Sequence, residues 1–115
     1  MNKTKIFDCT IRDGSYAVNF KFTCTDIKNI VSRQVKLGVE YIEIGHGQGL
    51  NASSPERGES LYSDVEYIDA AMTVAKNSKI GVFCIPGIAR MEDLKMAKDH
   101  GVSFNVPSAI SADGR

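Results

Sequence analysis

The sequence predicts an α/β fold made of parallel (β/α) units. Short apolar segments alternate with longer amphipathic ones in the order β-α-β-α-β-α-β, and the strand-like segments begin tens of residues apart. This spacing leaves room for a helical crossover between neighbouring strands, which makes the strands parallel. The third strand-like segment, Lys79–Ile85, is almost wholly apolar, which is typical of a parallel strand covered on both faces.

The first (β/α) unit is expected to open with a strand at Ile6–Cys9, followed by a long polar and aromatic loop from Arg12 to Phe22. A helix should begin near Thr23 or Thr25, since either residue could cap it. Gly38 should end this helix. Four residues at helical spacing predict its buried face: Ile27, Ile30, Val31 and Val35.

The second unit is expected to begin with a strand at Val39–Ile44. A loop from Gly45 to about Tyr62 follows, and loops of this length in a compact domain are usually functional or mobile. The next helix should start around Ser63, with Glu66 completing a capping box. Its predicted buried face consists of Val65, Ile68, Met72 and Ala75.

The last predicted elements are a helix at about Met91–His100 and a strand at Val102–Val106. Leu94 and Ala97 should form the buried stripe of this helix. The tail from Ser108 to Arg115 has no strong pattern. We therefore expect residues 1–115 to form a single domain of about four (β/α) units.

Two architectures fit this order of elements: a small open doubly wound sheet, or the first half of an eight-fold barrel. The chain contains neither GxGxxG at its first helix nor GxxxxGK[ST], which weakens the case for a nucleotide-binding sheet. A half barrel would leave two open strand edges and an uncovered interior.

Composition excludes several partners. Lys+Arg and Asp+Glu both total 14, so no basic excess favours nucleic acid. No apolar run approaches the length of a membrane span, and no apolar segment follows Lys3 and Lys5 as it would in a signal peptide. The 3 cysteines are an odd number without CxxC spacing, which favours a reducing, cytoplasmic location.

Four chemically capable side chains follow strand ends: Arg12, Asp13, Glu43 and His46. The carboxyl ends of parallel strands share one edge, so these groups should converge. Asp13 could bind a hard cation, and Arg12 could clamp an oxyanion. Glu43 would be costly to bury alone, and Arg12 is its natural partner. The plainer alternative is a structural Arg12–Glu43 pair with Asp13 capping a turn.

Two further residues near this edge have open roles. His46 lies between glycines, which would let its backbone approach a ligand closely, although such a histidine is often a turn residue. Tyr16 follows Gly14 by two residues and could point into the cleft, and with Arg12 and Glu43 it is an expected catalytic residue. His100, next to Gly101 at a helix end, is expected to be structural.

Two motifs carry a resemblance. The run from Asp8 to Gly14, DCTIRDG, resembles the D-x-T-[LI]-R-D-G signature of the metal-dependent pyruvate-type aldolases and lyases, TIM barrels that include hydroxymethylglutaryl-CoA lyase. The run from Glu43 to Leu50, EIGHGQGL, is similar to the corresponding run of the 4-hydroxy-2-oxovalerate aldolases. The agreement continues to the segment 85–95 and so covers nearly the whole chain.

This resemblance implies the N-terminal half of a TIM (β/α)8 barrel, with Mn²⁺ or Mg²⁺ as cofactor and a 2-oxo acid as substrate. It implies aldol cleavage or condensation through a pyruvate enolate. Asp13 would be a metal ligand that also contacts substrate, Arg12 would stabilise the enolate, and Glu43 would support Arg12. His46 is expected to bind substrate.

The sequence departs from the family pattern in two ways. The aldolases carry a general-base histidine where this chain has Tyr16, and a phenol is a much weaker base than an imidazole at neutral pH. The family's remaining metal ligands form an H-x-H pair, which these 115 residues lack. We therefore expect a piece of a longer enzyme, weak or inactive alone, that associates with a missing half barrel or with itself. Alternatives are a non-catalytic binding domain and an acyl-CoA-dependent synthase or lyase.

Overall fold

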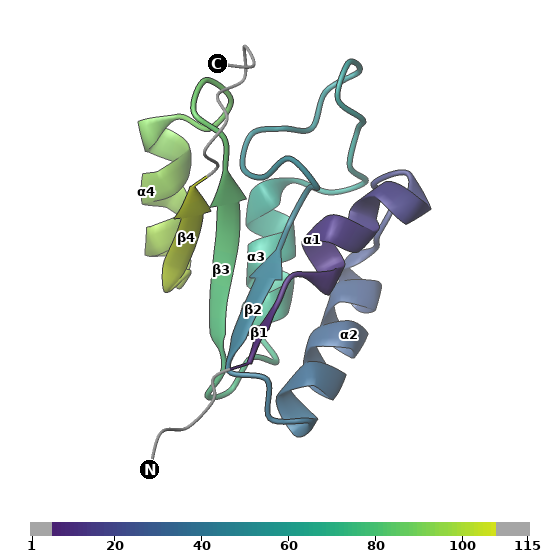
Figure 1. Cartoon of the computed structure of the whole chain (residues 1–115), viewed down its shortest axis with the longest axis vertical. Helices are drawn as coiled ribbons and strands as arrows, with labels where there is room; N and C mark the ends of the chain where they lie inside the picture. The colour runs from purple at the N-terminus through teal and green to yellow at the C-terminus, as the bar shows by residue number, and fades with distance from the viewer. Residues whose placement is uncertain (1–5, 108–115) are drawn as a thin grey trace.

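The computed structural model describes residues 6–107, which form a parallel sheet of four strands in the order β1-β2-β3-β4 (Figure 1). The strands are β1 (Phe7–Asp8), β2 (Tyr41–Ile44), β3 (Lys79–Cys84) and β4 (Phe104–Pro107). Successive strands are neighbours, so right-handed crossovers carry every connecting helix to the same face of the sheet. A doubly wound sheet would reverse its order and bear helices on both faces. The strand order therefore supports the barrel arrangement.

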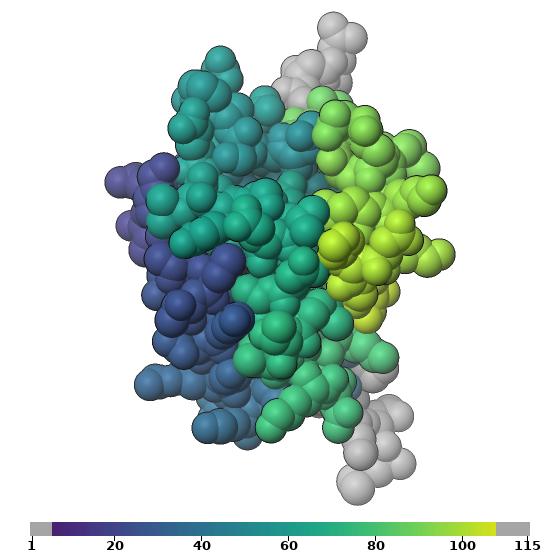
Figure 2. Space-filling view, turned by 180° about the vertical axis from the view of Figure 1, so that it is seen from behind, coloured from purple at the N-terminus to yellow at the C-terminus, as the bar shows by residue number. Residues whose placement is uncertain are grey.

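Three helices cover that face: α2 (Cys24–Lys36), α3 (Asp64–Met72) and α4 (Met91–Asp99). Figure 2 shows them side by side from behind, in the order of the chain. Capping boxes begin α2 at Thr23, one of the two predicted caps, and α3 at Ser63, where the sequence predicts a capping box. Arg90 begins α4, where its backbone N–H and side chain both donate to Asp93.

The core lies between these helices and the sheet. Alternate residues of β2 and β3 project into it, because successive side chains of a strand point to opposite faces. They meet the apolar stripes of the helices, and the residues involved on both sides are nearly inaccessible: Ile27, Val31, Ile42, Ile44, Ile68, Ala71, Ile80 and Val82.

The opposite face of the sheet carries no helix and is lined in layers. Strand register pairs Phe7 with Tyr41 at one level, and Glu43 with Gly81 and Gly81 with Phe104 at the next. The Phe104 ring occupies the space where a Cβ on Gly81 would lie, and it contacts the rings of Phe7 and Tyr41. Phe83 follows one level nearer the carboxyl ends. This face is the concave interior expected of part of a barrel.

The prediction of a loop from Arg12 to Phe22 is wrong. A helix, α1 (Thr10–Gly14), and a 3₁₀ turn, η1 (Ser15–Val18), occupy most of this segment. The Asp8 carboxylate accepts hydrogen bonds from the backbone and hydroxyl of Thr10 and from Gln34, which fixes the start of α1. Asn19 and Phe20 have positive φ angles and end the helical segment.

Smaller differences concern burial and boundaries. Met72, expected in the core, is 36% exposed because it lies at the end of α3, where it covers Gly101. Pro107 ends β4 rather than following it. The tail 108–115 lies outside the described residues, as do residues 1–5. No helix within residues 6–107 combines the length and hydrophobicity needed to cross a bilayer.

Candidate active site

The side chain of Arg12 is held from three directions at the carboxyl edge of the sheet. Its Nε atom pairs with a Glu43 carboxylate oxygen, and its Nη1 atom donates to the Gly47 carbonyl at 3.0 Å. The Phe83 ring lies beneath the guanidinium, with 4.3 Å between the Arg12 Cζ atom and the ring centroid. Elements far apart in the chain therefore fix one cation in place.

Glu43 lies on the uncovered sheet face and is 1% exposed. Burial raises the pKa of its carboxyl group, although the Arg12 guanidinium acts in the opposite direction. The expected Arg12–Glu43 pair is thus present.

Asp13 follows Arg12 on α1, and its side chain is exposed. Its backbone N–H donates to the Cys9 carbonyl as part of the helix. Within residues 6–107 its carboxylate has no hydrogen-bonding partner, so the side chain caps no turn among them. A carboxylate that the protein leaves free is available to a ligand.

His46 is 1% exposed, and the described chain engages both nitrogens of its ring. Its Nε2 atom lies 2.9 Å from the Gly58 carbonyl, and its Nδ1 atom accepts from the Gln48 backbone at 3.0 Å. These partners require a neutral ring protonated at Nε2. Burial lowers the pKa of His46. Phe20 stacks on the ring, 4.1 Å between centroids.

Tyr16 lies over Gly47, the residue whose carbonyl accepts the hydrogen bond from Arg12. A Cβ on Gly47 would come within 2.3 Å of the Tyr16 ring, so the two are in close contact. The Tyr16 ring also meets Phe20 edge-on, at 5.3 Å between centroids. Tyr16 is 46% exposed and stands at the same rim as Arg12.

The segment between β2 and α3 is fastened to this rim by its backbone. Gly49 packs so closely on β3 that a Cβ there would lie 2.1 Å from the Phe83 carbonyl oxygen. The next residue, Leu50, donates its N–H to that same oxygen. Further along, the Asn51 backbone donates to Asp64, whose pKa is raised by burial. The loop expected to be functional or mobile is therefore bonded to its neighbours.

Comparison with known proteins identifies the family of this chain. The model of the HMGL-like family matches residues 3–112, which is most of the chain. The chain belongs to the HMGL-like family.

The relatives that the chain resembles have two kinds of name. The chain is 46% identical over 96 residues to the 4-hydroxy-2-oxovalerate aldolase of Moorella thermoacetica, covering 84% of this chain and 28% of the relative. It is 41% identical over 95 residues to the oxaloacetate decarboxylase of Mycobacterium tuberculosis, covering 83% of this chain and 28% of the relative. The chain thus spans less than a third of the length of these relatives.

The resemblance of the sequence motifs implies a divalent metal, and the described residues fit this in part. The free, exposed carboxylate of Asp13 suits a hard cation, while Glu43 is occupied by Arg12. Residues 6–107 contain no group of three or more His, Cys, Asp or Glu side chains that could hold a metal ion. Asp13 therefore fits as one ligand, and a complete site needs others from outside this range.

The sequence analysis did not predict two of the groups that contact Arg12: the Gly47 carbonyl and the Phe83 ring. The Gly47 carbonyl is a backbone group without a side-chain signal. Phe83 could have been found from strand alternation. It lies between Val82 and Cys84, which face the helices, and must therefore point to the same face as Glu43.

Proposed function

We propose that this chain provides the Arg12, Asp13 and Glu43 portion of the active site of a carbon–carbon lyase acting on a 2-oxo acid. The observation that carries the proposal is the position of Arg12: Glu43, Gly47 and Phe83 hold the guanidinium, while its Nη2 group has no partner within residues 6–107. Next to it, Asp13 offers a free carboxylate at the carboxyl edge of the sheet, where barrel enzymes bind their substrates.

The reaction is aldol cleavage of a 4-hydroxy-2-oxo acid. A base removes the proton of the C4 hydroxyl group, the C3–C4 bond breaks, and its electron pair passes through C3 to the C2 carbonyl oxygen. The products are an aldehyde and the enolate of pyruvate, which a proton at C3 converts to pyruvate. Negative charge grows on the C2 oxygen, and the free N–H groups of Arg12 are placed to stabilise it.

A divalent cation, Mn²⁺ or Mg²⁺, would add Lewis-acid stabilisation of the same oxygen when bound. Asp13 would contribute one oxygen ligand to it and lie against the substrate. Glu43 acts through Arg12, because its carboxylate fixes the direction of the guanidinium. His46 holds the loop after β2 rather than the substrate, since its ring nitrogens are already engaged by the Gly58 carbonyl and the Gln48 backbone N–H.

Tyr16 marks where this site differs from the aldolases that it resembles. Its ring lies at the rim beside Arg12, where a phenol can donate a hydrogen bond to substrate or exchange a proton. The second candidate function, a non-catalytic domain that binds a metabolite or partner, is favoured by this same residue, because a tyrosine is a poor replacement for a histidine base.

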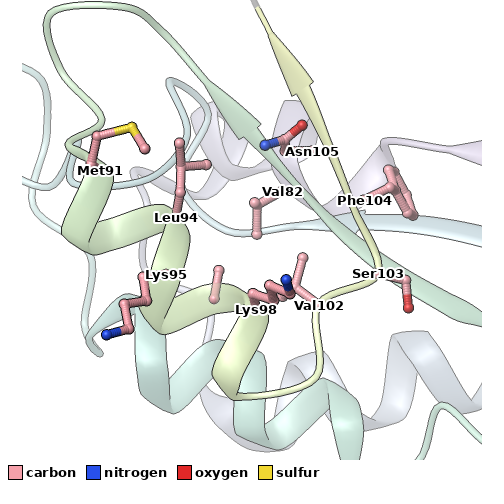
Figure 3. A pocket seen from close by; sticks show the side chains of 10 residues that line it. Val82, Met91, Leu94, Lys95, Lys98, Val102, Ser103, Phe104 and Asn105 are labelled. Carbon is pink, nitrogen blue, oxygen red and sulfur yellow. The ribbon is translucent and has the colours of Figure 1, made fainter.

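The remainder of the barrel is the expected partner of this chain. Strands β1 and β4 are the outer strands of the described sheet. An open groove of about 440 Å³ runs between α4 and β4, with Val82, Leu94 and Val102 among the apolar side chains lining it (Figure 3). We propose that further (β/α) units cover these edges and this groove, either in the same polypeptide or in another copy. Light scattering of the chain alone tests this: self-association supports the proposal, and a stable monomer at high concentration contradicts it.

A chimera tests the lyase function. Residues 1–107 of this chain replace the matching part of the Moorella thermoacetica aldolase, which restores a full-length protein. Exchange of the C3 protons of pyruvate with deuterium, followed by NMR in the presence of Mn²⁺, reports enolate formation without requiring the correct aldehyde. We expect exchange well above that of the buffer. A folded chimera without exchange would favour the binding-domain function.

A further inference from the structure

Phe83 has no assigned part in the chemistry, yet its ring lies against the Arg12 guanidinium. It leaves β3 on the uncovered face, one level nearer the carboxyl edge than Glu43. We propose that Phe83 is a positioning residue, whose ring holds the Arg12 guanidinium by a cation–π interaction and so limits the direction from which an oxyanion can approach. The inference rests on the proposed function and adds a residue to that site.

The directions left open by the three contacts are few. The Arg12 Cζ atom lies over the Phe83 ring, 4.3 Å from its centroid, within the range of a cation–π contact, so the ring occupies that side of the guanidinium. Glu43 occupies the Nε atom, and the Gly47 carbonyl takes one N–H of Nη1. The Nη2 end of the guanidinium has no partner within residues 6–107, and we expect an anion to approach there, at the edge that Nη2 shares with Nη1. Two neighbouring N–H groups in one plane suit a carboxylate or a 2-oxo acid, which present two oxygens in one plane.

We expect the Phe83 ring to hold the Arg12 guanidinium through the charge distribution of its π electrons as well as through its size. The Arg12 side chain is 17% exposed, so its charge is partly removed from water and the ring quadrupole replaces some of the lost hydration. A leucine at position 83 would fill part of the same space but offer no negative face to the cation. Leucine and phenylalanine at this position therefore differ in the ring quadrupole, the property that the proposal invokes.

Phenylglyoxal, which reacts with accessible guanidinium groups, provides the test on the 115-residue chain itself. The rate of modification of Arg12 is followed by peptide mass spectrometry, with Arg33 and Arg90 as internal references on exposed surfaces. Phe83 is replaced by Leu, Tyr or Trp, and separately by phenylalanines carrying one, two or three ring fluorines. Phe104→Leu is the matched control, since Phe104 lies on the same face and contacts Phe7 and Tyr41.

We expect Phe83→Leu to speed Arg12 modification about threefold or more, and Tyr or Trp to restore protection. Stepwise fluorination should raise the rate in step with the loss of ring quadrupole, while the melting temperature of the chain stays within a few degrees. A rate that responds to leucine but is flat across the fluorinated series would overturn the proposal, because the ring would then be only a steric cover. So would an equal effect of Phe104→Leu.

Adding oxalate, a planar dianion, separates this inference from the proposed function. Protection of wild-type Arg12 by oxalate, weakened in Phe83→Leu, supports both. If oxalate gives no protection while the fluorinated series stays graded, Phe83 still positions Arg12, and it is the assignment of Arg12 as an oxyanion clamp that fails.

Discussion

The Arg12 guanidinium and the Glu43 carboxylate form an ion pair in which the side chains are 17% and 2% exposed, respectively. Removing two charges from water is costly, and an ion pair this well buried often contributes no net stability. Burial raises the pKa of Glu43 despite the neighbouring cation, which agrees with that cost. We infer that the role of this ion pair is to position Arg12 and that it does not stabilise the fold.

Replacing Glu43 by Gln tests this attribution through pH. A carboxyl group whose pKa is raised in the folded state contributes stability at low pH, below its ordinary 4.5, and loses it as pH rises through the folded value. The wild-type chain should therefore lose stability relative to Glu43→Gln as pH rises above 4.5. Urea unfolding at several pH values measures the difference. A wild-type advantage that grows with pH would contradict the expectation.

His46 should give the opposite pH dependence. Its pKa is lowered in the folded state, so the unfolded chain binds more protons, and stability should fall as pH drops below the ordinary 6.5. Protonation would also cost the hydrogen bond from Gln48 to Nδ1. Thermal unfolding of wild type and His46→Gln between pH 7.5 and pH 5 provides the measurement, and only the wild type should show this component. His100→Gln removes the other histidine and serves as control. If that variant loses the component instead, His46 is not its source.

Two glycines of the same loop should differ in their response to alanine. At Gly49 a Cβ would collide with the Phe83 backbone, and the residue has φ +90°, so Gly49→Ala should cost about 3 kcal/mol or more. At Gly47 the obstacle is the partly exposed Tyr16 ring, which can move. The cost of Gly47→Ala should be about 1–3 kcal/mol, and Tyr16→Ala should relieve much of it. Urea unfolding of the single and double variants gives these values. Equal costs without relief would show that Tyr16 does not press on Gly47.

Tyr16 can be converted to the histidine of the aldolases. In the chimera with the Moorella thermoacetica aldolase, Tyr16→His should accelerate aldol cleavage of a 4-hydroxy-2-oxo acid, followed by NMR, by roughly 100-fold, the scale of one general base at the C4 hydroxyl group. Tyr16→Phe keeps the ring on Gly47 and removes only the hydroxyl group. If Tyr16→Phe abolishes cleavage and Tyr16→His does not restore it, the phenol itself takes part in proton transfer.

The sequence predicted the helices and the sheet well wherever local signals agreed with the fold. Thr23 and Ser63 cap their helices, and Gly38 and Gly101 follow helix ends with positive φ. The segment after β1 was misjudged because α1 is very short and starts from a tertiary contact: Gln34, on α2, helps to hold the Asp8 carboxylate. No pattern of local residues reports such a bond.

The site was predictable to a similar degree. Strand ends indicated that Arg12 and Glu43 would meet, since parallel strands present their carboxyl ends at one edge. The engagement of His46 was not predictable, because its partners are backbone groups of Gln48 and Gly58 that lie close only after the loop has folded. For the same reason the sequence could not show that the Gly47 carbonyl receives Arg12.

The central claim is that Arg12, fixed by its neighbours, stabilises the oxyanion of a 2-oxo acid. Its most direct test is pyruvate C3 exchange by the chimera carrying Arg12→Lys, which keeps the charge but lacks the planar fork of N–H groups that lets arginine bond Glu43, Gly47 and an anion in fixed directions. Arg33→Lys, on the exposed side of α2, is the matched control. The account predicts that Arg12→Lys lowers the exchange rate by roughly 100-fold or more while Arg33→Lys leaves it unchanged. Exchange by Arg12→Lys at the rate of the parent chimera would contradict it.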